Sequence, residues 1–66
     1  MKELTDLTEE HINALASTWA LIMDRSLVGF YKDKLNLLKK NELNFDRIPF
    51  GVAKGLKKLN YNIPKL

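Results

Sequence analysis

Hydrophobic side chains recur every third or fourth residue along the first two thirds of the chain, which is the period of an α-helix rather than that of a β-strand. The first apolar stripe consists of Ile12, Leu15, Ala16, Trp19, Ile22 and Met23. The second consists of Leu27, Val28, Tyr31, Leu35 and Leu38. Strict alternation of apolar and polar residues never lasts more than a few positions, so no strand is predicted. The sequence therefore predicts an all-α fold.

Local signals mark where the first two helices begin. Thr8 is placed to cap a helix by accepting a hydrogen bond from a first-turn amide, and the two glutamates after it suit the positive end of the helix dipole. The centre of the second stripe is rotated by about a quarter turn relative to the first. A break near residues 24–26, with Asp24 or Ser26 capping a new helix, explains that rotation. Because no proline or glycine enforces the break, one bent helix over residues 9–40 is the alternative.

A third helix follows a polar connection. Pro49 suits its first position. Three apolar residues share one side of this segment and three lysines the other: Val52, Leu56 and Leu59 against Lys54, Lys57 and Lys58. We therefore predict a small three-helix bundle with helices over residues 9–24, 26–40 and 49–60. Residues 1–66 form a single domain with a flexible tail over 60–66, since Pro64 disfavours helix in the residue before it.

The composition removes two common means of stabilising a short chain. Cysteine is absent and His11 is the only histidine, which excludes a disulfide scaffold and a thiolate zinc site. A domain of about 60 residues buries only about 60% of its unfolded surface, so a second subunit is a plausible stabiliser beside folding alone. No apolar run approaches the roughly 18 residues of a membrane span, and acidic residues follow the N-terminus where a signal peptide has basic ones. We expect a cytoplasmic protein with no membrane partner.

No group of residues has the spacing of a catalytic site. His11 follows Glu9 and Glu10, but residues one or two apart on a helix do not share a face. Gly51 and Gly55 lack the spacing of a phosphate loop. Three hydroxyl residues have no neighbouring base and suit a helix surface or a cap: Ser17, Thr18 and Ser26. We therefore predict no enzyme, with no catalytic residue, metal, cofactor or small-molecule substrate.

Charge divides the chain into an acidic and a basic part. Residues 1–24 carry a net charge of −4 and residues 25–66 a net charge of +7, which together give +3. Such asymmetry between the two parts is typical of a chain that meets a polyanionic partner. Most of the bases are lysine, whereas arginine is better suited to reading guanine edges. A solvated surface, a protein partner and a nucleic-acid backbone all remain open.

We interpret the chain as a non-catalytic helical module that regulates or assembles by binding another protein or a second copy of itself. An exposed aromatic residue beside lysines would anchor a partner. The candidate partner contacts are Phe50, Lys54, Lys57, Lys58 and Tyr61. The alternative is a nucleic-acid-binding regulator that contacts phosphates through lysines. Its candidate contacts are Lys39, Lys40, Lys54, Lys57 and Lys58.

Overall fold

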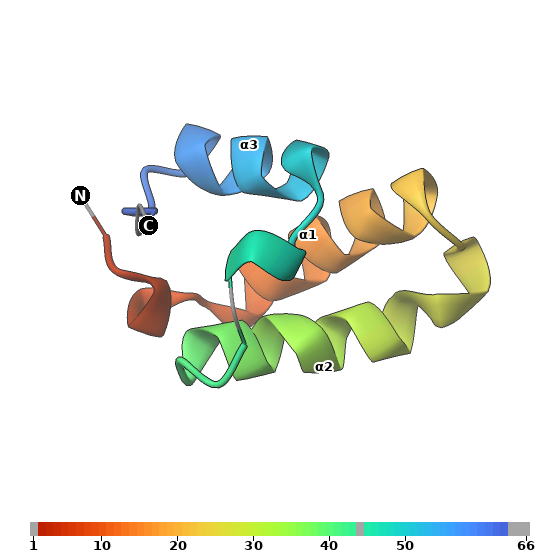
Figure 1. The fold of residues 1–66 in the computed structure, drawn as a ribbon, viewed down its shortest axis with the longest axis horizontal. Helices are drawn as coiled ribbons and strands as arrows, with labels where there is room; N and C mark the ends of the chain where they lie inside the picture. The colour runs from red at the N-terminus through yellow and green to blue at the C-terminus, as the bar shows by residue number, and fades with distance from the viewer. Residues whose placement is uncertain (1, 44, 64–66) are drawn as a thin grey trace.

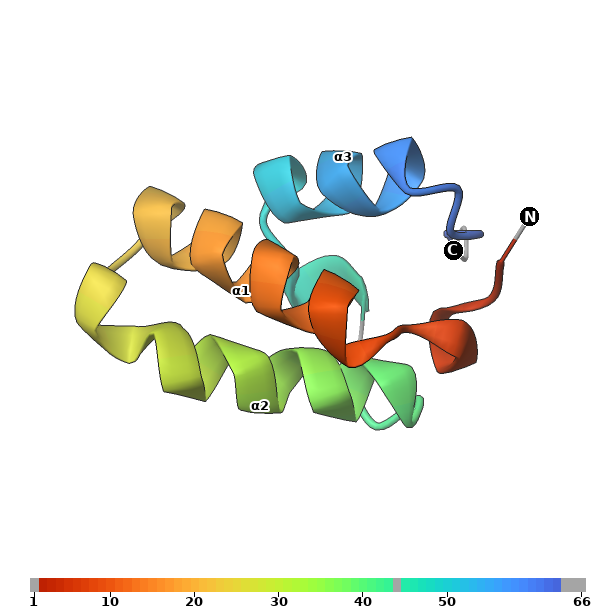
Figure 2. The same cartoon turned by 180° about the vertical axis from the view of Figure 1, so that it is seen from behind.

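The computed structural model describes residues 2–43 and 45–63, and within these ranges it is built from helices. The α-helices are α1 (Glu9–Ile22), α2 (Val28–Lys39) and α3 (Phe50–Lys58). Short 3-10 turns precede each of them: η1 (Leu4–Asp6), η2 (Arg25–Leu27) and η3 (Phe45–Arg47). α1 lies between α2 and α3 when the molecule is seen from either side (Figures 1 and 2). The predicted all-α fold with three helices is confirmed.

The first two helices are separate. The Thr8 hydroxyl accepts a hydrogen bond from the backbone amide of His11 at 3.1 Å, as the capping pattern predicts. α1 ends at Ile22, and Asp24 has an extended backbone with φ −152°. The Asp24 carboxylate then accepts hydrogen bonds from the amide (3.0 Å) and the hydroxyl (2.8 Å) of Ser26, which starts η2. The alternative of one bent helix over residues 9–40 is therefore wrong.

Each helix is slightly shorter than predicted. Pro49 lies one residue before α3 in an extended conformation, instead of occupying the first helical position. Its carbonyl oxygen accepts hydrogen bonds from the amides of Val52 and Ala53, both at 3.0 Å. Proline suits this place because it has no amide hydrogen of its own to satisfy.

The core lies where α1 faces both other helices. Its helical members are Ile12, Leu15, Ala16, Trp19, Ala20, Tyr31, Leu35, Leu38, Val52 and Leu56. The Trp19 ring stacks on the Tyr31 ring, with centroids 4.9 Å apart and planes 12° from parallel. Gly55 brings α3 close to α1, because a Cβ atom at this position would lie 2.9 Å from Leu15 Cδ2. The predicted stripes therefore form the core in their central parts.

The two apolar stripes are not buried at the end of the bundle where α1 joins α2. Four of their members are exposed to solvent: Ile22, Met23, Leu27 and Val28. α3 begins short of this end of the molecule (Figure 1), so no described element covers it. Apolar residues continue at the helical period into this end of the bundle, but no described helix buries them.

The first and last described segments of the chain meet at the opposite end of the bundle. The Lys2 amide donates to the carbonyl of Asn60 at 2.8 Å, and the Asn62 amide donates to the carbonyl of Lys2 at 2.6 Å. These bonds form a parallel bridge between Lys2 and Tyr61. Residues 60–63 are therefore a packed segment and not the flexible tail expected from the sequence. The rest of that tail, residues 64–66, lies outside the described residues.

Candidate interaction surface

α3 has a buried and an exposed side, as its sequence predicts. Val52 and Leu56 are fully buried, whereas Lys54, Lys57 and Lys58 are exposed. Phe50, the first residue of the helix, is 81% exposed. A large aromatic ring is thus held in solvent on the same helix as three cations.

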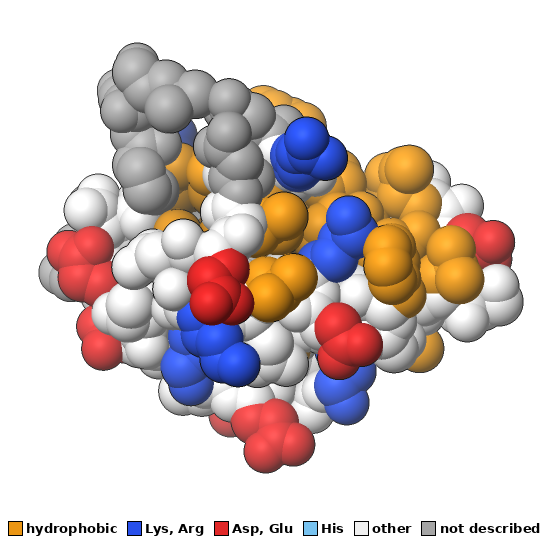
Figure 3. Space-filling model, turned by 60° about the horizontal axis from the view of Figure 1, so that its bottom comes forward, with side chains coloured by type: hydrophobic (Ala, Val, Ile, Leu, Met, Phe, Trp, Pro, Cys, Tyr) orange, Lys and Arg blue, Asp and Glu red, His pale blue; other side chains and the backbone are white. Residues whose placement is uncertain are grey.

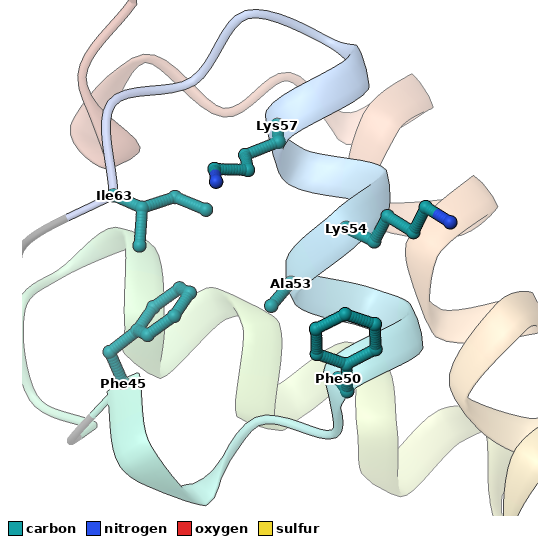
Figure 4. A pocket seen from close by; sticks show the side chains of 6 residues that line it. All are labelled: Phe45, Phe50, Ala53, Lys54, Lys57 and Ile63. Carbon is teal, nitrogen blue, oxygen red and sulfur yellow. The ribbon is translucent and has the colours of Figure 1, made fainter.

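A groove of about 350 Å³ lies beside α3 (Figure 4). We call it the α3 groove; it is lined by Phe45, Phe50, Ala53, Lys54, Lys57 and Ile63. Phe45 comes from η3 and Ile63 from the segment after α3, so three parts of the chain build it. Ala53 is small, which leaves room between the larger apolar side chains. The lining is apolar apart from two lysines.

The two lysines of the groove are oriented differently. Figure 4 shows the Lys57 side chain extending from α3 toward Ile63, whereas the Lys54 side chain extends away from Ile63 and Phe45. One ammonium group therefore lies close to the apolar walls and the other marks the outer rim. An occupant with an apolar side chain and a nearby carboxylate would match both features.

Three of the five residues predicted as partner contacts line this groove: Phe50, Lys54 and Lys57. Lys58 is exposed but does not line it. The prediction of Tyr61 as a surface contact is corrected, because this side chain is only 2% exposed. The sequence reasoning did not assign Phe45, Ala53 or Ile63 to the site; they lie at no common helical spacing, so periodicity could not group them.

Tyr61 is buried because it packs against the first turn of α1. Its hydroxyl lies 2.6 Å from Nδ1 of His11, and the two rings meet edge to face at 88° with centroids 5.6 Å apart. The ammonium group of Lys2 lies 5.2 Å from the centre of the Tyr61 ring. We call this arrangement of Lys2, His11 and Tyr61 the end clasp. His11 is partly buried within it.

The lysines of the nucleic-acid alternative are divided between two helices. Lys39 is partly buried and Lys40 exposed at the C-terminal end of α2. The other three belong to α3, and α1 lies between these helices (Figures 1 and 2). A nucleic acid that contacted all five would have to follow the surface from one side of α1 to the other.

Two further properties of the described residues bear on function. Within residues 2–43 and 45–63, no group of three or more histidine, aspartate or glutamate side chains is arranged to hold a metal ion. Across the same ranges, no helix combines the length and the apolar character needed to cross a bilayer.

Comparison with protein-family models, with curated proteins and with solved structures finds no match for this chain.

Proposed function

We propose that this protein is a non-catalytic interaction module that regulates or assembles by binding a protein partner in the α3 groove. The observation that carries the proposal is the position of Phe50, which is 81% exposed and lines an apolar groove together with two lysines. Exposed aromatic residues beside a pocket are typical anchors of protein interfaces, where a few residues supply most of the binding free energy.

The chemistry of the groove supports a particular kind of partner. A volume of about 350 Å³ accommodates one large apolar side chain. Lys54 and Lys57 favour carboxylates on either side of that anchor and accelerate the encounter with an acidic segment. The partner we propose is therefore an exposed protein segment with a leucine or an aromatic residue flanked by aspartate or glutamate.

The test uses a synthetic peptide with one phenylalanine flanked by acidic residues, and a second peptide with lysines in place of the acids. Binding is measured by isothermal titration calorimetry with the full chain and three variants. We expect Phe50→Ala to weaken binding of the acidic peptide by about tenfold or more. Lys57→Glu should weaken it as well, whereas Lys40→Glu, the same charge change on α2, should leave it unchanged.

Equal binding of the two peptides, or equal loss in Lys57→Glu and Lys40→Glu, would contradict the proposal. The nucleic-acid alternative gives a different pattern, because its affinity comes from phosphate contacts and counterion release. It requires steep loss of binding to a DNA or RNA duplex between about 50 and 200 mM salt. It also requires similar losses in both lysine variants and none in Phe50→Ala.

A further inference from the structure

A second apolar surface lies where α1 joins α2. Six large apolar residues within ten positions are between 38% and 64% exposed: Leu21, Ile22, Met23, Leu27, Val28 and Phe30. We call this surface the apolar tip. Figure 3 shows hydrophobic side chains gathered at this end of the molecule, with few charges among them. None of the six lines the α3 groove.

The apolar tip is large for a chain of this size. Summed over the six residues, backbone included, its exposed fractions correspond to roughly 600 Å² of surface, at the upper end of the largest patch found on a typical monomer. A stable interface of standard size buries about 800 Å² on each partner. The tip therefore offers an area sufficient for a small but specific interface.

The charges at the tip indicate what covers it. Asp24 and Arg25 are adjacent, exposed and of opposite sign, and in the sequence they lie between the two groups of residues that form the apolar surface. In a two-fold symmetric interface every contact occurs twice: if one residue of the first copy contacts a second residue of the other copy, the reverse contact is also made. Asp24 of one copy would then face Arg25 of the other, twice. Both hydrogen bonds from Ser26 go to Asp24 Oδ1, so Oδ2 is positioned to accept from a guanidinium group.

The same charges disfavour a lipid bilayer as the occupant. Hydrogen bonds from the Ser26 hydroxyl and then the Ser26 amide lower the pKa of Asp24 below its ordinary value of 3.8. The carboxylate is consequently ionised at neutral pH, and carrying it into hydrocarbon with the tip would be costly. Asp24 and Arg25 cancel each other, so this pair gives a strongly acidic or a strongly basic partner little advantage. A second copy of the chain satisfies both charges.

We propose that two copies of this protein associate through their apolar tips as a two-fold symmetric dimer, with Asp24 and Arg25 paired across the axis. The dimer rests on residues outside the α3 groove and adds self-association to the proposed binding of a partner. It also buries hydrophobic residues that the single chain leaves in solvent, which is the expected driving force of association.

The test is sedimentation velocity of the full chain over a concentration series from about 1 μM to about 1 mM. We expect a dimer whose population rises with concentration. In the double variant Leu21→Lys/Met23→Lys the dissociation constant of the dimer should be at least about tenfold larger. Lysine is chosen because it suits the last turn of a helix, so the fold should be retained. Far-UV circular dichroism checks this, and Lys40→Glu serves as the control that leaves the dimer unchanged.

Arg25→Glu provides an independent second variant. It places two carboxylates opposite two others, so we expect about tenfold or greater weakening that high salt partly reverses. The proposal is overturned if the wild-type chain remains a monomer across the series or if both variants dimerise normally. It is also overturned if the tip instead binds phosphatidylcholine–phosphatidylserine vesicles and Leu21→Lys/Met23→Lys abolishes that binding. Titration of the acidic peptide into the double variant distinguishes failure of the dimer from failure of the groove.

Discussion

Removing the Tyr61 hydroxyl tests how much the end clasp contributes to stability. The hydroxyl lies 2.6 Å from His11 Nδ1, and the Tyr61 ring is 2% exposed. Phenylalanine keeps the ring in place together with its edge-to-face contact on the imidazole. The substitution Tyr61→Phe therefore removes the hydrogen bond and little else.

The expected loss follows from the environment of this bond. An intramolecular hydrogen bond contributes about 0.5–1.5 kcal/mol net, so we expect Tyr61→Phe to lower the free energy of unfolding by about 1 kcal/mol. A domain of this size has roughly 3–10 kcal/mol of stability in total. A loss of about 1 kcal/mol lowers the melting temperature of so small a domain by about 4–8 °C.

Trp19 provides the assay, because it is the only tryptophan and is buried in a stack on Tyr31. Urea unfolding followed by its fluorescence is compared for the wild type, Tyr61→Phe, His11→Ala and the double variant. The double-mutant cycle isolates the pair, and we expect a coupling free energy of about 1 kcal/mol. A coupling below about 0.3 kcal/mol would refute the clasp as a source of stability.

Four further outcomes are expected. Gly29→Ala should raise the free energy of unfolding by about 0.5–1 kcal/mol, because no atom beyond its chain neighbours and its own helix backbone lies within 4 Å of the added methyl. Gly55→Ala should lower it by about 1 kcal/mol, because the crowded α1–α3 contact costs more than the gain in helix propensity; a stability gain would show that the core yields. Phe50→Ala should change stability by less than about 0.5 kcal/mol, since this ring is 81% exposed. Asp24→Asn should lower the urea midpoint at neutral pH but lose its effect as the pH falls below 3.8, because the lowered pKa of Asp24 stabilises the fold only while the carboxylate is ionised; a difference that persists at low pH would contradict this.

The helices could be predicted because their signals are local. Thr8 caps α1 by accepting a hydrogen bond from an amide three residues later, and Asp24 caps η2 by accepting one from the amide two residues later. The helical period likewise places Leu15, Trp19 and Leu35 in the core. The same period also assigned Met23 to the core, yet it is 64% exposed. Periodicity shows which side of a helix is apolar, but not how far the covering element reaches.

The site was only partly predictable for a related reason. Phe50, Lys54 and Lys57 lie on one helix, so their proximity follows from its geometry. Tyr61 was misassigned because its partner, His11, lies fifty residues earlier in the sequence. The residues around either position carry no pattern that predicts this contact. Burial that depends on a long-range pairing of backbone segments has no short-range signature in the chain.

The pairing of Lys2 with Tyr61 determines how this domain can be joined to other chains. Paired backbones lie about 5 Å apart, so the described ends leave the bundle as near neighbours. A short connection would therefore span the distance between these two described segments, and a surface loop of a host protein could accept the described bundle as an insertion. In such a fusion the hairpin of α1 and α2 would project away from the junction (Figure 1). The apolar tip at its far end would then stay accessible to other molecules.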